Sequence, residues 1–125
     1  MDRDIDQSWR AEMTGWIHSG DSDLATKGLL RLVLHDPDGP WVERVIKECM
    51  HGDFGYDVRL LAVTCVGHVA RLRGGVTDES LVEDVRALRH DANLELAEEA
   101  GHVLEEVELY TSRHQPAHDG PHRSP

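Results

Sequence analysis

The sequence predicts an all-α protein, and three observations support this fold class. Apolar residues recur at steps of three and four along most of the chain, which is the spacing of one face of a helix. Short clusters of Gly, Pro, Asp and Ser separate these segments. No segment shows sustained alternation of apolar and polar residues, so we expect no β-sheet. The pattern of this 125-residue sequence therefore predicts six helices, arranged as about three helical hairpins.

The first two expected helices form a hairpin at the start of the chain. The first, over residues 4–18, is marked by one apolar stripe made of Ile5, Trp9, Met13, Trp16 and Ile17. It ends at Ser19-Gly20, after which Asp21 or Ser22 can cap the second helix. The second helix ends at His35-Asp36-Pro37-Asp38-Gly39, because this sequence holds both a proline and a glycine.

The third expected helix is the most clearly amphipathic segment of the chain. Pro40 suits its first turn, and the helix ends near Gly52. One side is apolar and carries Trp41, Val42, Val45, Ile46, Cys49 and Met50. The opposite side is charged and carries Glu43, Arg44, Lys47 and Glu48. We expect the apolar side to pack against the core and the charged side to face solvent.

The segment from Asp57 to Gly75 is the expected central helix. Its apolar residues surround most of the helix circumference, which is typical of a helix packed on several sides. They are Val58, Leu60, Leu61, Ala62, Val63, Cys65, Val66, Val69, Ala70 and Leu72. Asp57 is placed to serve as the N-cap, and Gly74-Gly75 can provide the left-handed residue that ends the helix.

Two further helices complete the expected domain. Thr77 or Asp78 can cap a fifth helix, whose apolar stripe is Leu81, Val82, Val85 and Leu88, and a sixth spans about residues 92–110. We expect residues 1–113 to form one helical domain. Residues 114–125 contain three prolines and no large apolar residue, so we expect a disordered tail. His114, His118 and His122 recur every four residues in this tail, but the prolines prevent a helix on which they could form a metal-binding face.

A partial repeat relates the fourth and sixth expected helices. At a separation of 34 residues it pairs Asp57 with Asp91, Leu60 with Leu94, Gly67 with Gly101, His68 with His102 and Val69 with Val103. Stacked helical hairpins bury apolar faces that a single hairpin leaves exposed, so the repeat predicts an α-solenoid. Gly67 and Gly101 are expected where a neighbouring helix comes close, since glycine inside a helix costs about 1 kcal/mol relative to alanine.

Charge and cysteine content limit the classes of function. The net charge of −11 argues against a nucleic-acid-binding protein, which needs a basic surface for phosphates, and favours a basic partner. The two cysteines, Cys49 and Cys65, lie on apolar helix faces, where we expect free thiols rather than a disulfide.

The first ten residues do not resemble a signal peptide or a membrane anchor, so we expect a cytoplasmic protein that does not bind membranes.

One part of the chain resembles a known family. The residues that carry the similarity are Trp41-Val42, Cys49, Asp57-Val58-Arg59, Ala62 and Cys65-Val66-Gly67-His68-Val69-Ala70-Arg71. Together with the helices that follow, roughly residues 39 to 108, they resemble the small HEAT-like immunity proteins of bacterial polymorphic and contact-dependent growth inhibition toxin systems. The resemblance implies a HEAT-like α-solenoid without enzymatic activity, which binds a cognate toxin domain in the cytoplasm and blocks it.

Acidic residues are concentrated near the end of the expected domain. Between Asp78 and Glu108 there are eleven acidic residues against two arginines. An ordinary solvated helix face would explain this pattern, but an acidic face that meets a basic surface, such as the cleft of a nuclease, explains it as well. We expect the toxin to be bound by Asp78, Glu79, Glu83, Asp84, Glu95, Glu98, Glu99 and Glu106. The alternative function is a generic HEAT-like scaffold for protein–protein interactions.

Enzymatic and metal-dependent functions are the less favoured alternatives. Cys65 and His68 lie three residues apart on one helix and could face each other as a nucleophile and base or as two metal ligands. A structural zinc site needs four ligands, and the chain has no second pair of cysteines. The sequence contains no phosphate-binding loop, nucleophile elbow or dinucleotide fingerprint. We therefore expect no catalytic residue, no metal and no cofactor.

Overall fold

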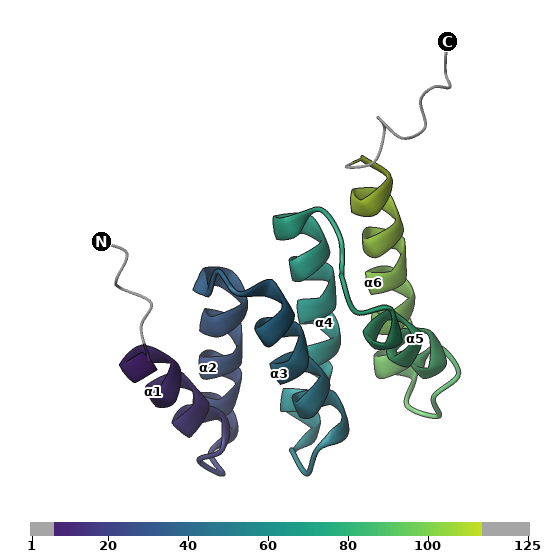
Figure 1. Ribbon diagram of the computed structural model, residues 1–125. Helices are drawn as coiled ribbons and strands as arrows, with labels where there is room; N and C mark the ends of the chain where they lie inside the picture. Colours follow the sequence, from purple (N-terminus) through teal and green to yellow (C-terminus); the bar gives the residue numbers. More distant parts are fainter. Residues whose placement is uncertain (1–6, 114–125) are drawn as a thin grey trace.

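The computed structural model describes residues 7–113, and this part of the chain is all-helical (Figure 1). It contains six helices and no strand: α1 (Gln7–Ile17), α2 (Ser22–His35), α3 (Gly39–His51), α4 (Tyr56–Arg73), α5 (Glu79–Leu88) and α6 (Leu94–Arg113). The expected all-α class and the number of helices are confirmed. The predictions for residues 1–6 and for the tail, including His114, His118 and His122, lie outside the described residues.

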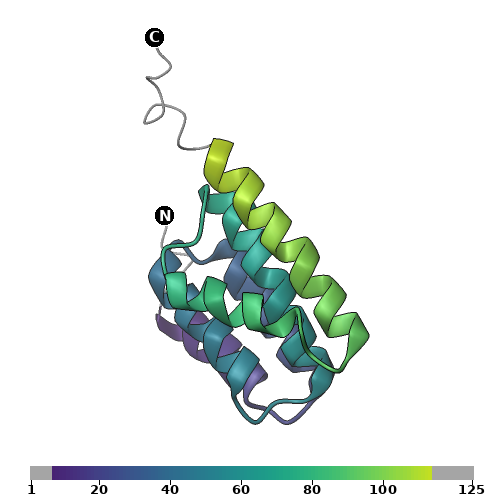
Figure 2. The ribbon, with the colours of Figure 1, turned by 90° about the vertical axis from the view of Figure 1, so that its right-hand side faces the viewer.

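The six helices form three hairpins whose second members lie side by side. Within each hairpin, α1 packs on α2, α3 on α4, and α5 on α6. In addition, α4 packs between α2 and α6, so these three helices form one row, with α1 and α6 at opposite ends of the molecule (Figures 1 and 2). The helix α4 contacts α2, α3, α5 and α6. The central position expected for this apolar segment is therefore confirmed.

Most helix ends follow the expected sequence signals. The Asp21 carboxylate caps α2 by accepting hydrogen bonds from the backbone N–H groups of Asp23 and Leu24, at 2.9 and 3.2 Å. Asp78 caps α5, and Gly74 ends α4 in the left-handed conformation, with φ of 78°. These caps satisfy backbone groups that a helix leaves unpaired at its ends.

The expected cap of α4 is wrong. The helix α4 begins at Tyr56, two residues before the Val58 start that a cap at Asp57 implies, so Gly55 occupies the N-cap position and has no side chain to accept a hydrogen bond. Asp57 therefore lies in the first helical turn, where a carboxylate is favoured by the helix dipole. Its Oδ2 accepts a hydrogen bond from the Ser22 hydroxyl at 3.3 Å, which connects the beginnings of α4 and α2.

The core is built around α4, but one side of this helix is less buried than its composition predicts. Eight of its residues are buried: Val58, Ala62, Val63, Cys65, Val66, Gly67, Val69 and Ala70. Leu60 and Leu61 are only partly buried, and Leu72 is 50% exposed. These leucines lie on the side of α4 that no helix of the described chain covers completely.

The prediction that the charged side of α3 faces solvent is wrong at one position, Glu43. This residue is only 1% exposed, although the amphipathic pattern places it among charged neighbours. Its carboxylate accepts hydrogen bonds from Thr77 and Asp78, which lie between α4 and α5. A buried carboxylate is tolerated when such donors replace water, and a contact more than thirty residues away cannot be read from helix periodicity.

The two glycines of the repeat have different surroundings. A Cβ atom at Gly67 would collide with the Glu106 carboxylate of α6 and would lie 3.7 Å from Val103. The close approach expected at Gly67 is confirmed. At Gly101 nothing lies within 4 Å of the position of a Cβ atom, so the same expectation is wrong there. The difference arises because Gly67 lies between two packed helices, whereas α6 is the last helix of the row.

Candidate functional site

The outer side of α6 is the most distinctive surface of the described chain. Glu98 and Glu105 are exposed on this side, and no Lys or Arg occurs between Leu94 and Tyr110. Two large apolar side chains share the same side, since Leu94 is 74% exposed and Leu109 is 48% exposed. Leu109 follows Leu94 by fifteen positions along the helix, a distance of roughly 22 Å. The surface therefore combines negative charge with an apolar residue near each end.

Two further carboxylates of α6 are held by hydroxyl groups of α4. The Tyr56 hydroxyl donates to Glu95 Oε1 at 2.6 Å, and the Thr64 hydroxyl donates to Glu99 Oε2 at 2.6 Å. The hydrogen bond to Glu95 raises the pKa of the Tyr56 phenol. These contacts offset the repulsion expected between like charges four residues apart on a helix. They also fix the direction of two carboxylates beside the exposed ones.

A shallow groove separates α4 and α6 next to these residues. One part of it, about 440 Å³, is lined by Thr64, His68, Glu99, His102, Glu105, Glu106 and Leu109. Burial and the nearby Arg71 lower the pKa of His68, although Glu106 and Glu99 act in the opposite direction. Neutral His68 is therefore favoured, so it adds little positive charge to the groove. We call Leu94, Glu95, Glu98, Glu99, Glu105, Glu106 and Leu109 the α6 acidic face.

The four site residues predicted on α5 occupy different surroundings. Asp78 accepts hydrogen bonds from the backbone N–H and the hydroxyl of Ser80, at 2.9 and 2.6 Å. Asp84 lies 2.8 Å from His51 Nε2 and 2.9 Å from Lys47 Nζ, both on α3. Both carboxylates therefore already have partners within the protein.

The remaining acidic residues of α5 are exposed. Glu83 pairs with Arg86 at 2.6 Å on the same helix, and Glu79 lies in the first turn of α5. The structure therefore brings Glu95, Glu98, Glu99 and Glu106 together on α6, beside α4. Asp78 and Asp84, in contrast, contact residues of α5 and α3.

Sequence reasoning missed several residues of this surface. Glu105 was counted among the acidic residues but was not assigned to the site, and the exposure of Leu94 and Leu109 was not foreseen. A signal for Leu109 is present in the sequence, since it follows Glu98 by eleven residues and Glu105 by four. Both separations place residues on one side of a helix. Leu94 has the same signal, since it precedes Glu98 by four residues and Glu105 by eleven.

The Cys65–His68 pair is divided between the core and the groove. Cys65 is fully buried, whereas His68 is partly exposed and lines the groove. Burial raises the pKa of the Cys65 thiol and raises that of the Cys49 thiol to about 12, so both favour the unreactive protonated form. Within residues 7–113, no group of three or more His, Cys, Asp or Glu side chains is arranged to hold a metal ion.

Comparisons with protein-family models, with curated proteins and with solved structures give no significant match for this chain. The resemblance to HEAT-like immunity proteins therefore stays a prediction. None of the helices between residues 7 and 113 combines the length and the apolar composition needed to cross a membrane.

Proposed function

We propose that this protein binds and neutralises a cognate bacterial toxin domain by covering a basic surface of the toxin with the α6 acidic face. The observation that carries the proposal is the composition of this face, which joins five carboxylates and two exposed leucines with no Lys or Arg between them along α6. The nearest arginines on the α5 side are Arg86 and Arg89, which line a hollow beside Glu105. The resemblance of residues 39 to 108 to immunity proteins adds support. A nuclease is the toxin class with the best charge complementarity, because its cleft must attract phosphates.

The two kinds of side chain on this face would have different roles in binding. Exposed carboxylates attract a basic partner over a distance, which raises the association rate at low salt. Apolar residues that become buried slow dissociation, because they lose favourable contact area when the complex opens. Leu94 and Leu109 are placed to act in this way, at the two ends of the charged surface. Inhibition would then need no catalytic step, since a bound protein excludes substrate from the cleft.

Co-expression tests the proposed function directly. The protein should restore growth of cells that produce a toxin domain encoded beside its gene, and the two proteins should co-purify in equal amounts. A failure to rescue growth with every neighbouring toxin, together with many unrelated co-purified proteins, would support the scaffold function instead.

Binding kinetics test the surface itself. Glu98→Lys should lower the association rate about five-fold or more at low ionic strength, and the effect should decrease as salt is added. Glu12→Lys is the matched control, because it makes the same change of charge at an exposed position on α1, at the opposite end of the molecule. Leu109→Ser should mainly raise the dissociation rate. Equal effects of Glu98→Lys and Glu12→Lys would show that net charge matters and that the α6 acidic face does not.

A further inference from the structure

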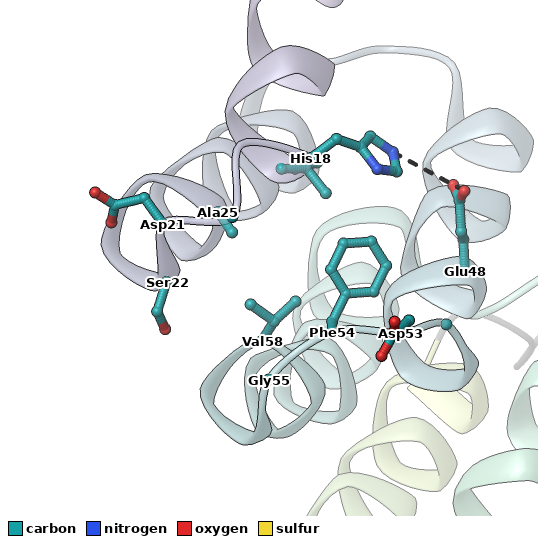
Figure 3. A pocket seen from close by; sticks show the side chains of 12 residues that line it. His18, Asp21, Ser22, Ala25, Glu48, Asp53, Phe54, Gly55 and Val58 are labelled. Carbon is teal, nitrogen blue, oxygen red and sulfur yellow. Dashed lines mark ion pairs between the residues drawn. The ribbon is translucent and has the colours of Figure 1, made fainter.

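A second concave site lies at the end of the molecule where the turn between α1 and α2 meets the loop between α3 and α4 (Figure 3). The cavity measures about 470 Å³, which is within the range of small-molecule sites. None of its lining residues belongs to the α6 acidic face. An inference about this cavity therefore does not depend on the proposed function.

The inner wall of the cavity is apolar and is formed by four separate segments. Ile17, Ala25 and Val58, from α1, α2 and α4, are each at most 3% exposed. Phe54, in the loop before α4, contributes a partly buried ring, whose centroid lies 5.5 Å from that of the His18 ring. In Figure 3 the Phe54 ring lies between His18 and Val58. This wall offers apolar contact and the face of an aromatic ring.

The rim of the cavity carries negative charge. Asp21, Glu48 and Asp53 line it, and no Lys or Arg does. Glu48 and Asp53 lie to one side of Phe54 in Figure 3, with Asp21 and Ser22 on the other side. The nearest ion pair of Glu48 is with His18, at 4.0 Å, and the Glu48 side chain remains 58% exposed. Glu48 and Asp53 can therefore approach a cationic group at the mouth of the cavity.

Helix dipoles do not reverse this charge. The positive N-terminal ends of α2 and α4 meet here, but so do the negative C-terminal ends of α1 and α3. The partial charges of two helix beginnings and two helix ends offset each other. The Asp21 carboxylate also occupies the N-terminus of α2 by capping it. The side chains at the rim therefore determine the sign of the potential.

We propose that this cavity binds a small organic cation in which an ammonium group is joined to an apolar body. The apolar body lies against the partly exposed Phe54 ring, over the floor formed by Val58 and Ala25, where apolar area of the ligand and of Phe54 is removed from water. The ammonium group lies at the rim beside Glu48 and Asp53. An ammonium group over the Phe54 ring gains a further cation–π attraction. An anion of the same shape lacks both electrostatic contributions and meets carboxylates at the rim.

A charge series of ligands tests the proposal. Phenethylamine, 2-phenylethanol and phenylacetate have similar shapes but carry positive, zero and negative charge. Titration into the 15N-labelled full chain should shift the amide signals of Gly20, Gly52 and Gly55 with phenethylamine, with a Kd on the order of millimolar. Phenethylamine should bind at least five-fold more tightly than phenylacetate. Equal or tighter binding of phenylacetate, or no shift at the three glycines, overturns the proposal.

Variants then locate the cation. Glu48→Gln combined with Asp53→Asn should weaken phenethylamine binding roughly five-fold and leave 2-phenylethanol binding unchanged. Both side chains are exposed, so the fold is expected to remain, which a circular dichroism spectrum checks. Glu12→Gln combined with Glu108→Gln removes the same charge away from the cavity and should leave binding unchanged. Equal weakening by the two double variants would overturn the assignment of the rim carboxylates.

Discussion

The carboxylate of Glu43 accepts hydrogen bonds from both the backbone N–H and the hydroxyl of Thr77, at 2.9 and 3.0 Å. A third hydrogen bond reaches it from the backbone N–H of Asp78 at 2.8 Å. Since Asp78 is also the N-cap of α5, this one buried side chain on α3 fixes the position at which α5 begins. The α5–α6 hairpin is thereby connected to the preceding one by polar contacts as well as by apolar packing.

Removal of the Glu43 carboxylate should destabilise the fold. Glu43→Ala leaves the backbone N–H groups of Thr77 and Asp78 without their acceptor in a partly buried region, and each such group costs about 1–3 kcal/mol when it is buried. We expect the free energy of unfolding in urea to fall by about 3 kcal/mol. Glu48→Ala is the matched control, because it makes the same change at a largely exposed position of the same helix and should change stability by less than about 0.5 kcal/mol. Similar values for the two variants would contradict the role assigned to Glu43.

A partly buried ion pair connects α1 to the turn between α2 and α3. Arg10 Nε and Nη2 donate to the two carboxylate oxygens of Asp36 at 2.6 and 2.7 Å, and the Asp36 side chain is fully buried. The Arg10 guanidinium also lies 4.8 Å from the centroid of the Trp41 ring. Arg73, near the end of α4, donates to the backbone carbonyls of Asp36 and Pro37. This turn is therefore held from both α1 and α4.

Loss of one member of this pair should be costly. Asp36→Ala leaves the guanidinium of Arg10 without its carboxylate, and because this group is 25% exposed we expect a loss of about 2–3 kcal/mol, below the cost of breaking a fully buried pair. Arg10→Lys keeps the charge but loses the paired hydrogen bonds, so we expect a smaller loss of about 1–2 kcal/mol. Urea unfolding of both variants measures these differences. An Arg10→Lys variant as unstable as Asp36→Ala would show that the two-point geometry, not the charge, provides nearly all of the stabilisation.

The two glycines of the repeat should respond differently to alanine. Gly101→Ala places a methyl group in open space within a helix, so the free energy of unfolding should rise by up to about 1 kcal/mol. Gly67→Ala forces the Glu106 carboxylate outward, which offsets part or all of the same gain. Thermal unfolding should therefore give a higher Tm for Gly101→Ala than for Gly67→Ala. A higher Tm for Gly67→Ala would mean that Glu106 moves aside at no cost.

Asp84 should contribute to stability at neutral pH and not in strong acid. Partial burial raises the pKa of this carboxyl, but the hydrogen bonds from His51 and Lys47 outweigh this effect and hold the pKa below its usual range. The native state therefore favours the charged form more strongly than the unfolded chain does. The stabilisation is present above about pH 4, the ordinary Asp pKa, and is lost as the pH falls through the lowered value.

The Asp84→Asn variant measures this pH dependence. Its free energy of unfolding should be about 1 kcal/mol below that of the native sequence at pH 7, because the charged contacts with Lys47 and His51 are removed. The difference should shrink between pH 4 and pH 2, where the native carboxyl becomes protonated. A difference that stays constant over this range would show that the contacts of Asp84 with α3 do not depend on its charge.

The sequence by itself determined the helices of the described region and most of their ends. Apolar spacing, Asp21, Asp78, Pro40 and Gly74 are local signals, since a helix and its caps depend on residues at most a few positions apart. The central place of α4 was also predictable, because a helix that is apolar around most of its circumference must be covered on several sides. The prediction of the α4 cap failed because the helix begins two residues earlier than a cap at Asp57 requires, which moves the N-cap position to Gly55.

Only the tertiary structure decided which charged residues are available to a partner. Glu43, Asp36 and Asp84 resemble surface residues in the sequence, but Glu43 and Asp36 are buried and all three have partners on other segments. Conversely, Leu94 and Leu109 are exposed although their residue type favours the core. Side-chain burial and pairing depend on contacts between residues that are distant in the chain. For this reason the acidic segment was visible in the sequence, whereas its division into α6 carboxylates beside α4 and α5 carboxylates with internal partners was not.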